Sequence, residues 1–216
     1  MNGIQLESVQ DVVDLGVMLS RSGKTSAHCS EKSTKGLRVV GHIFRAFRTR
    51  NREFLLKMFR VYVRPILEYN SPAWSPFLKK DARMIERVQR TFTRRIPGLR
   101  HYSYSERLRI LNLKSLEQCR LENDLVLAFR MLKGGIELRF EDFFTKSTVT
   151  RTRGHSEKLV IPGDHLEPVR NFFSNRGPAI WNSLPQHVID SPSVNVFKKR
   201  LGDVDLTRFL DILHWT

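Results

Sequence analysis

The sequence predicts a mainly α protein, a helical bundle with a short N-terminal strand region and a small mixed C-terminal region. Apolar residues recur at spacings of three and four over most of residues 37–132, which is the period of a helix. Helix-starting residues and Gly or Pro stops separate these stretches. The chain of 216 residues is also 40% apolar, enough to form a core despite a formal charge of +15.

The positive charge is concentrated in one third of the chain. Residues 36–100 hold sixteen basic and four acidic side chains, a net charge of +12, whereas residues 1–35 are balanced. We therefore expect four regions: an N-terminal segment (1–35), a basic helical region (36–100), a helical packing region (101–146) and a tail with loops, short strands and a final helix (147–216). A folded basic region of this kind usually binds phosphate or an acidic surface.

The N-terminal segment predicts a strand over residues 11–19, with Gly16 at a bulge or at a close backbone approach. A first helix is expected next, and its apolar stripe consists of Leu37, Val40, Phe44 and Phe47. Arg45 and Arg48 fall between these apolar positions, so they belong to its polar side.

A second helix is expected after Asn51, whose side chain can cap its N-terminus. Its apolar stripe consists of Leu55, Met58, Phe59 and Tyr62. Pro65 should kink or end this helix, because proline has no N–H to donate and its ring clashes with the preceding turn.

The third helix, expected from about residue 77 to residue 96 and stopped by Pro97-Gly98, is the most informative element. At ~100° per residue, four arginines fall within roughly 60° of one another; they are Arg83, Arg87, Arg90 and Arg94, the arginine ridge. The opposite side of the helix is apolar and consists of Leu78, Ile85, Val88, Phe92 and Ile96. Asp81 and Glu86 are the acidic residues expected to compensate the repulsion along the ridge.

We predict that the arginine ridge contacts nucleic-acid phosphates, together with Arg45 and Arg48 of the first helix. A guanidinium suits this task because its planar fork donates two hydrogen bonds to phosphate oxygens. The alternative is an ordinary solvated outer face, although such faces mix charges of both signs.

The remaining elements are expected mainly to pack. The segment from Ser103 to Glu106 is typical of a helix start, the segment from Ser115 to Gln118 fits a capping box, and Gly134-Gly135 ends the helix that follows Ser115. Residues 148–162 predict a loop with one or two short strands, and a last helix is expected over 193–201. The aromatic residues of the tail are expected to form a core rather than to stack on bases.

Several classes of function are excluded on the sequence. The longest apolar run, Leu125 to Phe129, is too short for a membrane span, and no signal peptide is evident, so a soluble intracellular protein is expected. Cys29 and Cys119 are too far apart for a zinc motif and are predicted to be free thiols.

No adjacent Asp-Asp pair, phosphate loop, GxSxG or HExxH motif is present, so neither a metal, a cofactor nor self-contained catalysis is expected. The basic triplet Lys198-Lys199-Arg200 is too short to assign nuclear import, which leaves a nuclear location open.

A series of motifs resembles one family. The segments are YVRPILEY (62–69), AWSP (73–76), IERVQR (85–90), IPGL (96–99), YSERL (104–108), TRGHS (152–156), FSNR (173–176) and IWNSLP (180–185), with DLGV (14–17) and His28 upstream. In this order they resemble the region after the catalytic palm of non-LTR (LINE-like) retrotransposon reverse transcriptases, of the jockey and chicken-repeat type. The resemblance covers about residues 11–201, and the series is more specific than any single motif.

The resemblance implies a catalytically incomplete C-terminal fragment of an RNA-directed DNA polymerase. The palm Asp-Asp motif of this family precedes the segment that DLGV resembles, and residues 36–100 would correspond to a helical, thumb-like region that grips the template–primer duplex. The expected partner is therefore the RNA or DNA backbone, bound with low sequence specificity. Two alternatives stay open: a domesticated module that binds a protein through apolar faces left by the missing palm, and a non-functional relic of a transposable element.

Overall fold

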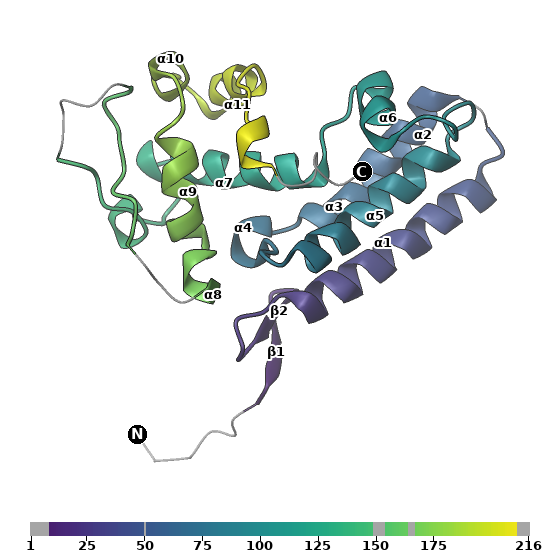
Figure 1. Ribbon diagram of the computed structural model, residues 1–216, viewed down its shortest axis with the longest axis horizontal. Coiled ribbons are helices and arrows are strands. Elements are labelled where there is room, and N and C mark those ends of the chain that lie inside the picture. Colours follow the sequence, from purple (N-terminus) through teal and green to yellow (C-terminus); the bar gives the residue numbers. More distant parts are fainter. Residues whose placement is uncertain (1–8, 50, 149–153, 164–166, 211–216) are drawn as a thin grey trace.

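Helices make up most of the protein, and the mainly α prediction is confirmed (Figure 1). The computed structural model describes residues 9–49, 51–148, 154–163 and 167–210. The strands and longer helices are β1 (Asp11–Asp14), β2 (Val17–Ser20), α1 (Ser26–Ala46), α2 (Arg52–Met58), α5 (Lys79–Arg95), α6 (Tyr104–Leu111), α7 (Leu116–Leu132), α9 (Phe173–Trp181) and α11 (Val194–Gly202). The shorter elements are the π-helix η1 (Phe59–Val63), α3 (Arg64–Glu68), α4 (Ser71–Trp74), the 3₁₀ turns η2 (Phe140–Asp142) and η3 (Thr207–Phe209), α8 (Glu167–Arg170) and α10 (Gln186–Ile189).

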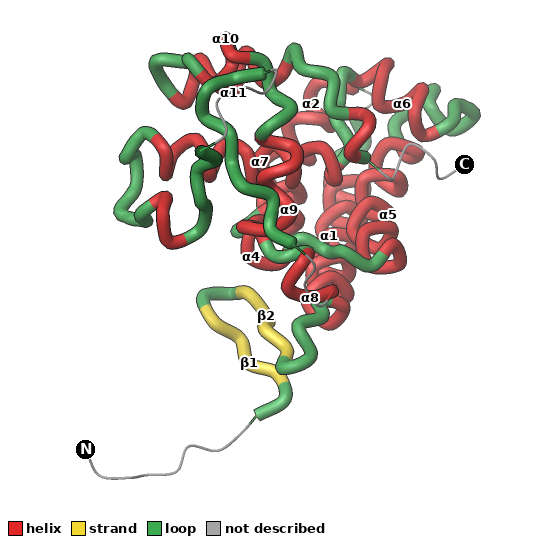
Figure 2. Tube along the Cα trace, turned by 60° about the vertical axis from the view of Figure 1, so that its left-hand side comes forward, coloured by secondary structure: helices red, strands yellow, loops and turns green. Residues whose placement is uncertain are grey.

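The N-terminal strand region is a two-stranded antiparallel hairpin that projects from the helical body (Figures 1 and 2). Its turn consists of Leu15 and Gly16, which have φ values of 44° and 80°. Two consecutive left-handed residues are typical of the tight type I′ hairpin turn. Gly16 therefore lies in a turn, and the predicted bulge is not present at this position.

The hairpin is attached to α1 by a histidine. The Nδ1 atom of His28 accepts a hydrogen bond from the Met18 N–H at 3.1 Å, and its ring lies 4.6 Å from the ring of Trp74. His28 is buried, as is Cys29 beside it. Helix α1 begins at Ser26, well before Leu37, the first residue of the apolar stripe that predicts this helix.

Pro65 is predicted to kink or to end the second helix, and it does not end it. The chain continues as helix from Arg52 to Glu68, through α2, η1 and α3. Directly before the proline, the Arg64 N–H donates to the carbonyl of Phe59, five residues earlier, as in a π-helix. This wider turn takes up the proline within a continuous helical segment.

The predicted ends of the next helices are confirmed. Helix α5 is followed by Gly98 in the left-handed conformation, with φ of +82°. Ser103 and Glu106 form a complete capping box at the start of α6. At the start of α7 the Ser115 side chain accepts from the Gln118 N–H at 3.1 Å, whereas the Gln118 side chain donates to Glu122. The predicted capping box at Ser115 is therefore only half formed.

Two hydrophobic cores share helix α7. One core joins β2, α1, the segment from α2 to α3, α4 and α5 and reaches Leu116 at the start of α7. The other starts at Leu121 in the same helix and includes α9, α10 and α11. An ion pair between Arg176 and Asp124, at 2.8 Å, and a hydrogen bond from Arg176 to the Pro72 carbonyl tie the two halves together.

Most aromatic residues in and before the tail pack into the second core, as predicted. Phe140, Phe144, Phe173 and Trp181 are buried, whereas Phe172 is about half exposed. Within 148–162 a strand-like pairing is limited, among the described residues, to a single bridge between Lys146 and Leu159, and residues 149–153 lie outside the described ranges. The last helix begins after Ser193, whose side chain accepts from the Val196 N–H.

Gly36 provides a test of the packing between α1 and its neighbours. A Cβ atom there would lie 3.1 Å from side-chain atoms of both Leu67 and Val88, closer than ordinary contact. We expect Gly36→Val to lower the free energy of unfolding by about 1–3 kcal/mol, because the helices must separate to admit the side chain. Urea denaturation measures the change.

Gly41 is the matched control, because it lies in the same helix and a Cβ atom there would meet nothing within 4 Å. Gly41→Val should change the free energy of unfolding by no more than about 0.5 kcal/mol. Equal urea midpoints for the two variants would contradict the close approach at Gly36.

His28 predicts a dependence of stability on pH. Burial, followed by the nearby Lys32 charge, lowers its pKa from 6.5 to about 4. Below pH 6.5 the unfolded chain gains a proton that the folded chain rejects, so the free energy of unfolding should fall between pH 6.5 and 4, by up to about 3 kcal/mol. His28→Asn keeps an acceptor for Met18 but cannot titrate, so its stability should fall less over this window. Parallel pH profiles for the two proteins would argue against this role of His28.

Candidate nucleic-acid interface

The position of the predicted site depends on how α5 packs against α1. The two helices run parallel, since contacts between them appear in the same order along both. Near their starts the Ser26 hydroxyl donates to Asp81 at 2.6 Å, and farther along the Ser33 hydroxyl donates to the Met84 carbonyl at 2.8 Å. Near their ends the rings of Phe44 and Phe92 lie 5.6 Å apart. Both C-terminal ends therefore lie at the same end of the bundle.

This pairing brings arginines from two parts of the sequence to one end of the molecule. Arg45 and Arg48 are exposed at the end of α1, and Arg94 and Arg95 are exposed in the last turn of α5. Cations are favoured at these positions, because each helix C-terminus carries about half a negative charge. The surface that results is nevertheless cationic, since four full charges outweigh two half charges.

The arginine ridge is only partly available to a ligand. Arg83, Arg87 and Arg94 are exposed, as predicted, whereas Arg90 is half-buried. The Arg90 guanidinium lies 4.6 Å from the centre of the Tyr104 ring, on helix α6. Arg90 thus contributes to the contact between α5 and α6, and the ridge is interrupted at its third member.

Arg107, which the charge pattern does not single out, lies against the same ring of Tyr104. Its guanidinium is 5.6 Å from the ring centre and donates to the Thr93 hydroxyl and to the Tyr102 carbonyl. Burial lowers the pKa of Arg107, and the charges of Arg94 and Arg90 lower it further, while Tyr104 acts in the opposite direction. The charges of Arg94 and Arg90 therefore act against the charge of Arg107.

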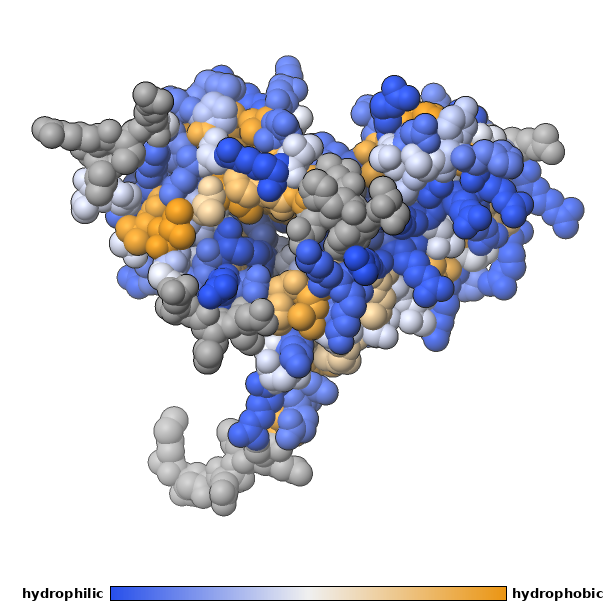
Figure 3. Space-filling view, in the orientation of Figure 1, coloured by the Kyte–Doolittle hydropathy of each residue, from blue (hydrophilic) through white to orange (hydrophobic). Residues whose placement is uncertain are grey.

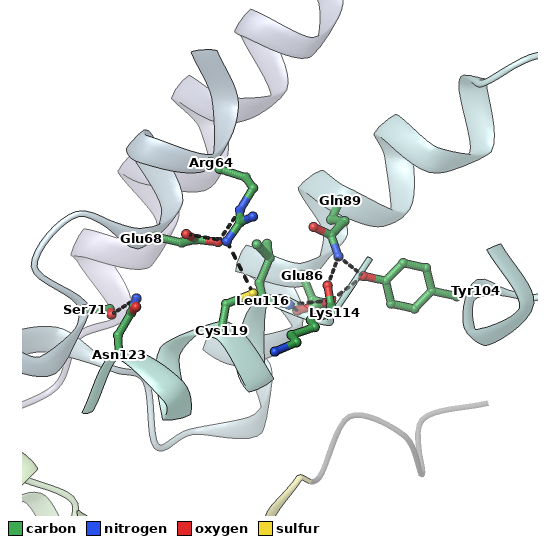
Figure 4. Close-up of polar contacts among 10 residues, drawn as sticks. All are labelled: Arg64, Glu68, Ser71, Glu86, Gln89, Tyr104, Lys114, Leu116, Cys119 and Asn123. Atoms are coloured by element: carbon green, nitrogen blue, oxygen red, sulfur yellow. Dashed lines mark hydrogen bonds and ion pairs between the residues drawn. The ribbon is translucent and has the colours of Figure 1, made fainter. Parts of the chain in front are cut away.

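The two acidic residues expected to compensate the ridge are turned into the protein instead. Asp81 accepts the hydrogen bond from Ser26, and Glu86 is fully buried. Figure 4 shows Glu86 accepting hydrogen bonds from the Tyr104 hydroxyl and from the Leu116 N–H at the start of α7. The expectation that Asp81 and Glu86 balance the ridge is therefore wrong, because both carboxylates form internal contacts between helices.

The Glu86 contacts set the positions of α6 and α7 relative to α5. Gln89 donates to both the Tyr104 hydroxyl and the Lys114 carbonyl, at 3.0 and 2.8 Å. Burial raises the pKa of Glu86, whereas the hydrogen bond from Tyr104 and the charge of Arg120 oppose that shift. Burial, with the Glu86 charge, also raises the pKa of Tyr104 well above its usual value, so the phenol keeps its proton and donates it. Tyr104 is thereby held where Arg90 and Arg107 can lie against its ring.

A basic cavity lies where α5 ends. It has a volume of about 570 Å³ and is lined by Phe44, Arg94, Arg95, Ile96, Pro97, Gly98 and Arg100. The Arg95 guanidinium is held 4.4 Å from the centre of the Phe44 ring. Helical periodicity does not find this site, because Arg95 lies off the ridge and Arg100 follows the helix. The signal available in the sequence is the density of arginines around the Pro97-Gly98 stop.

The other candidate chemistries find little support among the described residues. No group of His, Cys, Asp or Glu side chains there is placed to hold a metal ion. Cys29 and Cys119 are buried free thiols, and burial raises their pKa values to about 11 and about 12, so both are protonated at neutral pH. Within the same ranges, no helix combines the length and apolar character that a membrane span requires.

The two C-terminal arginines of the ridge should behave differently when mutated. Arg90→Gln removes the contact with the Tyr104 ring and should lower the free energy of unfolding by about 0.5–2 kcal/mol. Arg94→Gln removes an exposed charge and should change it by no more than about 0.5 kcal/mol. Urea denaturation of the two variants provides the comparison, and equal destabilisation would show that Arg90 is not a packing residue.

Comparison with known proteins adds one relative. No family model matches the chain, and no solved structure matches it. An uncharacterized protein of Caenorhabditis elegans is 26% identical to it over 134 residues, which is 61% of this chain and 67% of that protein. The name of that protein states no activity, so the resemblance to retrotransposon reverse transcriptases stays a prediction.

Proposed function

We propose that this protein binds the phosphate backbone of RNA or DNA, with little sequence selectivity, through the C-terminal ends of α1 and α5. The observation that carries the proposal is the parallel pairing of these helices, which gathers Arg45, Arg48, Arg94 and Arg95 at one end of the bundle. Arginine on phosphate positions a nucleic acid without reading its bases.

The dimensions of α5 suit a backbone ligand. Arg83 and Arg94 are eleven residues apart, which is about 16 Å at about 1.5 Å per residue. Over that length a duplex presents several phosphates, since it carries about one negative charge per 1.7 Å of its axis. The exposed members of the ridge extend the basic surface along one side of the helix.

We further propose that the protein derives from the region after the palm of a non-LTR retrotransposon RNA-directed DNA polymerase, and is itself catalytically incomplete. The ordered series of motifs supports this origin. In such an enzyme a basic helical surface next to the palm would hold the template–primer duplex. The chain offers no adjacent Asp-Asp pair of its own for metal-assisted polymerisation.

A second candidate, binding to a protein, is favoured by an apolar groove at the opposite end of α1. The groove has a volume of about 400 Å³ and lies between the hairpin and helices α4, α8 and α9, with Met18, Trp74 and Phe172 among its lining. In Figure 3 hydrophobic surface is visible directly above the hairpin. This candidate is favoured if Phe172→Asp abolishes the binding of a protein partner and if neither heparin nor nucleic acid displaces that partner.

The nucleic-acid proposal predicts strongly salt-dependent binding. If about four phosphates are neutralised, the logarithm of the association constant should fall against the logarithm of salt concentration with a slope of roughly −3 to −4. Replacing Arg45, Arg48, Arg87 and Arg94 together by Gln should weaken binding to all sequences alike and flatten the slope. Fluorescence anisotropy with unrelated oligonucleotides measures both effects.

The matched control changes four exposed cations elsewhere and consists of Arg109→Gln, Arg130→Gln, Lys198→Gln and Lys199→Gln. This variant loses the same net charge, so it should largely keep the affinity and the slope if the α1 and α5 surface is the site. Equal losses in the two variants would mean that overall charge, not this surface, drives binding.

A further inference from the structure

The basic cavity at the end of α5 is an open depression in the cationic surface. Three arginines are among its lining residues, Arg94, Arg95 and Arg100, and no acidic residue is. Its volume of about 570 Å³ is in the range of ligand sites and exceeds what a single ion needs. A flat arginine surface would instead contact phosphates from one side only.

Two contacts hold the walls of the cavity in place. The Arg95 guanidinium lies against the Phe44 ring, which limits the positions of its long side chain. At the Pro97-Gly98 turn, Arg52 donates to the Pro97 carbonyl through a long hydrogen bond of 3.5 Å, and a Cβ atom on Gly98 would come within 3.1 Å of the same guanidinium. The turn at Pro97-Gly98 is therefore braced by a further cation close to the site.

The balance of charge at the cavity favours an anion with more than one negative charge. Helix α5 ends here, and its C-terminus contributes about half a negative charge against three full positive ones. An internal phosphodiester carries a single charge, whereas a terminal phosphate monoester carries about 1.5 to 2 negative charges at neutral pH and exposes three acceptor oxygens. Three arginine forks match the second group better than the first.

We propose that this cavity binds the terminal phosphate of a nucleic-acid strand, so that the protein holds strand ends in preference to strand interiors. The inference rests on the proposed function, because the adjoining surface of α1 and α5 would hold the rest of the strand. Phe44 is the aromatic residue of the lining, beside the three arginines. The ligand class is a 5′- or 3′-phosphorylated RNA or DNA end.

The test compares single-stranded oligonucleotides of one sequence that differ only in their ends. One carries a 5′-phosphate and one a 5′-hydroxyl, each labelled at the 3′ end, and a second pair carries the 3′-phosphate and 3′-hydroxyl with a 5′ label. For at least one pair the phosphorylated strand should bind about tenfold more tightly at low salt, the size of effect expected for additional charge-assisted hydrogen bonds. Equal affinity within both pairs would overturn the proposal.

Two variants locate the effect. Arg100→Gln removes an exposed cavity arginine that lies outside any helix, and it should abolish the preference for the phosphorylated end. Arg87→Gln, on the ridge but outside the cavity, should weaken both oligonucleotides equally and keep the preference. Circular dichroism checks that both variants are folded.

The outcomes separate the two proposals. If both oligonucleotides of a pair bind with the salt dependence expected above but without preference, backbone binding stands and the end-binding site does not. A preference that survives Arg100→Gln would likewise contradict this cavity. If no oligonucleotide binds, both proposals are wrong.

Discussion

The close approach of α1 and α5 is the constraint on which the rest of the molecule depends. Gly36 allows it, because the space where a side chain would begin is filled by Leu67 and Val88. The two helices lie parallel, and the contacts of Phe44 with Phe92 and Arg95 set a register in which their C-terminal ends coincide. The arginines that follow each apolar stripe are therefore brought together. Antiparallel pairing would have placed Arg45 and Arg94 at opposite ends of the bundle. The basic surface is thus a product of helix orientation as much as of composition.

The distribution of carboxylates has an equal part in shaping that surface. Asp81 and Glu86 of α5 contact Ser26 of α1 and the start of α7, respectively, inside the protein. Their charges are therefore directed at hydroxyl and N–H donors rather than at the neighbouring arginines. A helix with both signs in its sequence consequently presents mostly one sign to solvent.

Local chemistry predicts a large part of this fold. The N-terminal starts of α6, α7 and α11 follow from Ser103, Ser115 and Ser193, because an N-cap depends only on residues within one turn. Helical periodicity also predicts the exposed side of α5, but not that Arg90 lies against Tyr104, because that contact joins two elements. The cavity has the same origin: Phe44 and Arg100 are far apart in the sequence, and only tertiary packing brings them together. Pairing direction between helices leaves no short-range pattern that could be recognised beforehand.

The π-helix before Pro65 has a consequence for how the second helical segment keeps its register. Its fully buried side chains are Leu55, Phe59, Val63 and Leu67, a strict repeat of four. In a regular α-helix each step of four residues overshoots a full turn by about 40°, so three steps would rotate the last side chain about 120° away from the first. The wide turn holds more residues per revolution and absorbs part of that drift. Phe59–Val63 therefore keeps these four side chains closer to one side of the segment, so that one apolar edge continues past Pro65 within the same core.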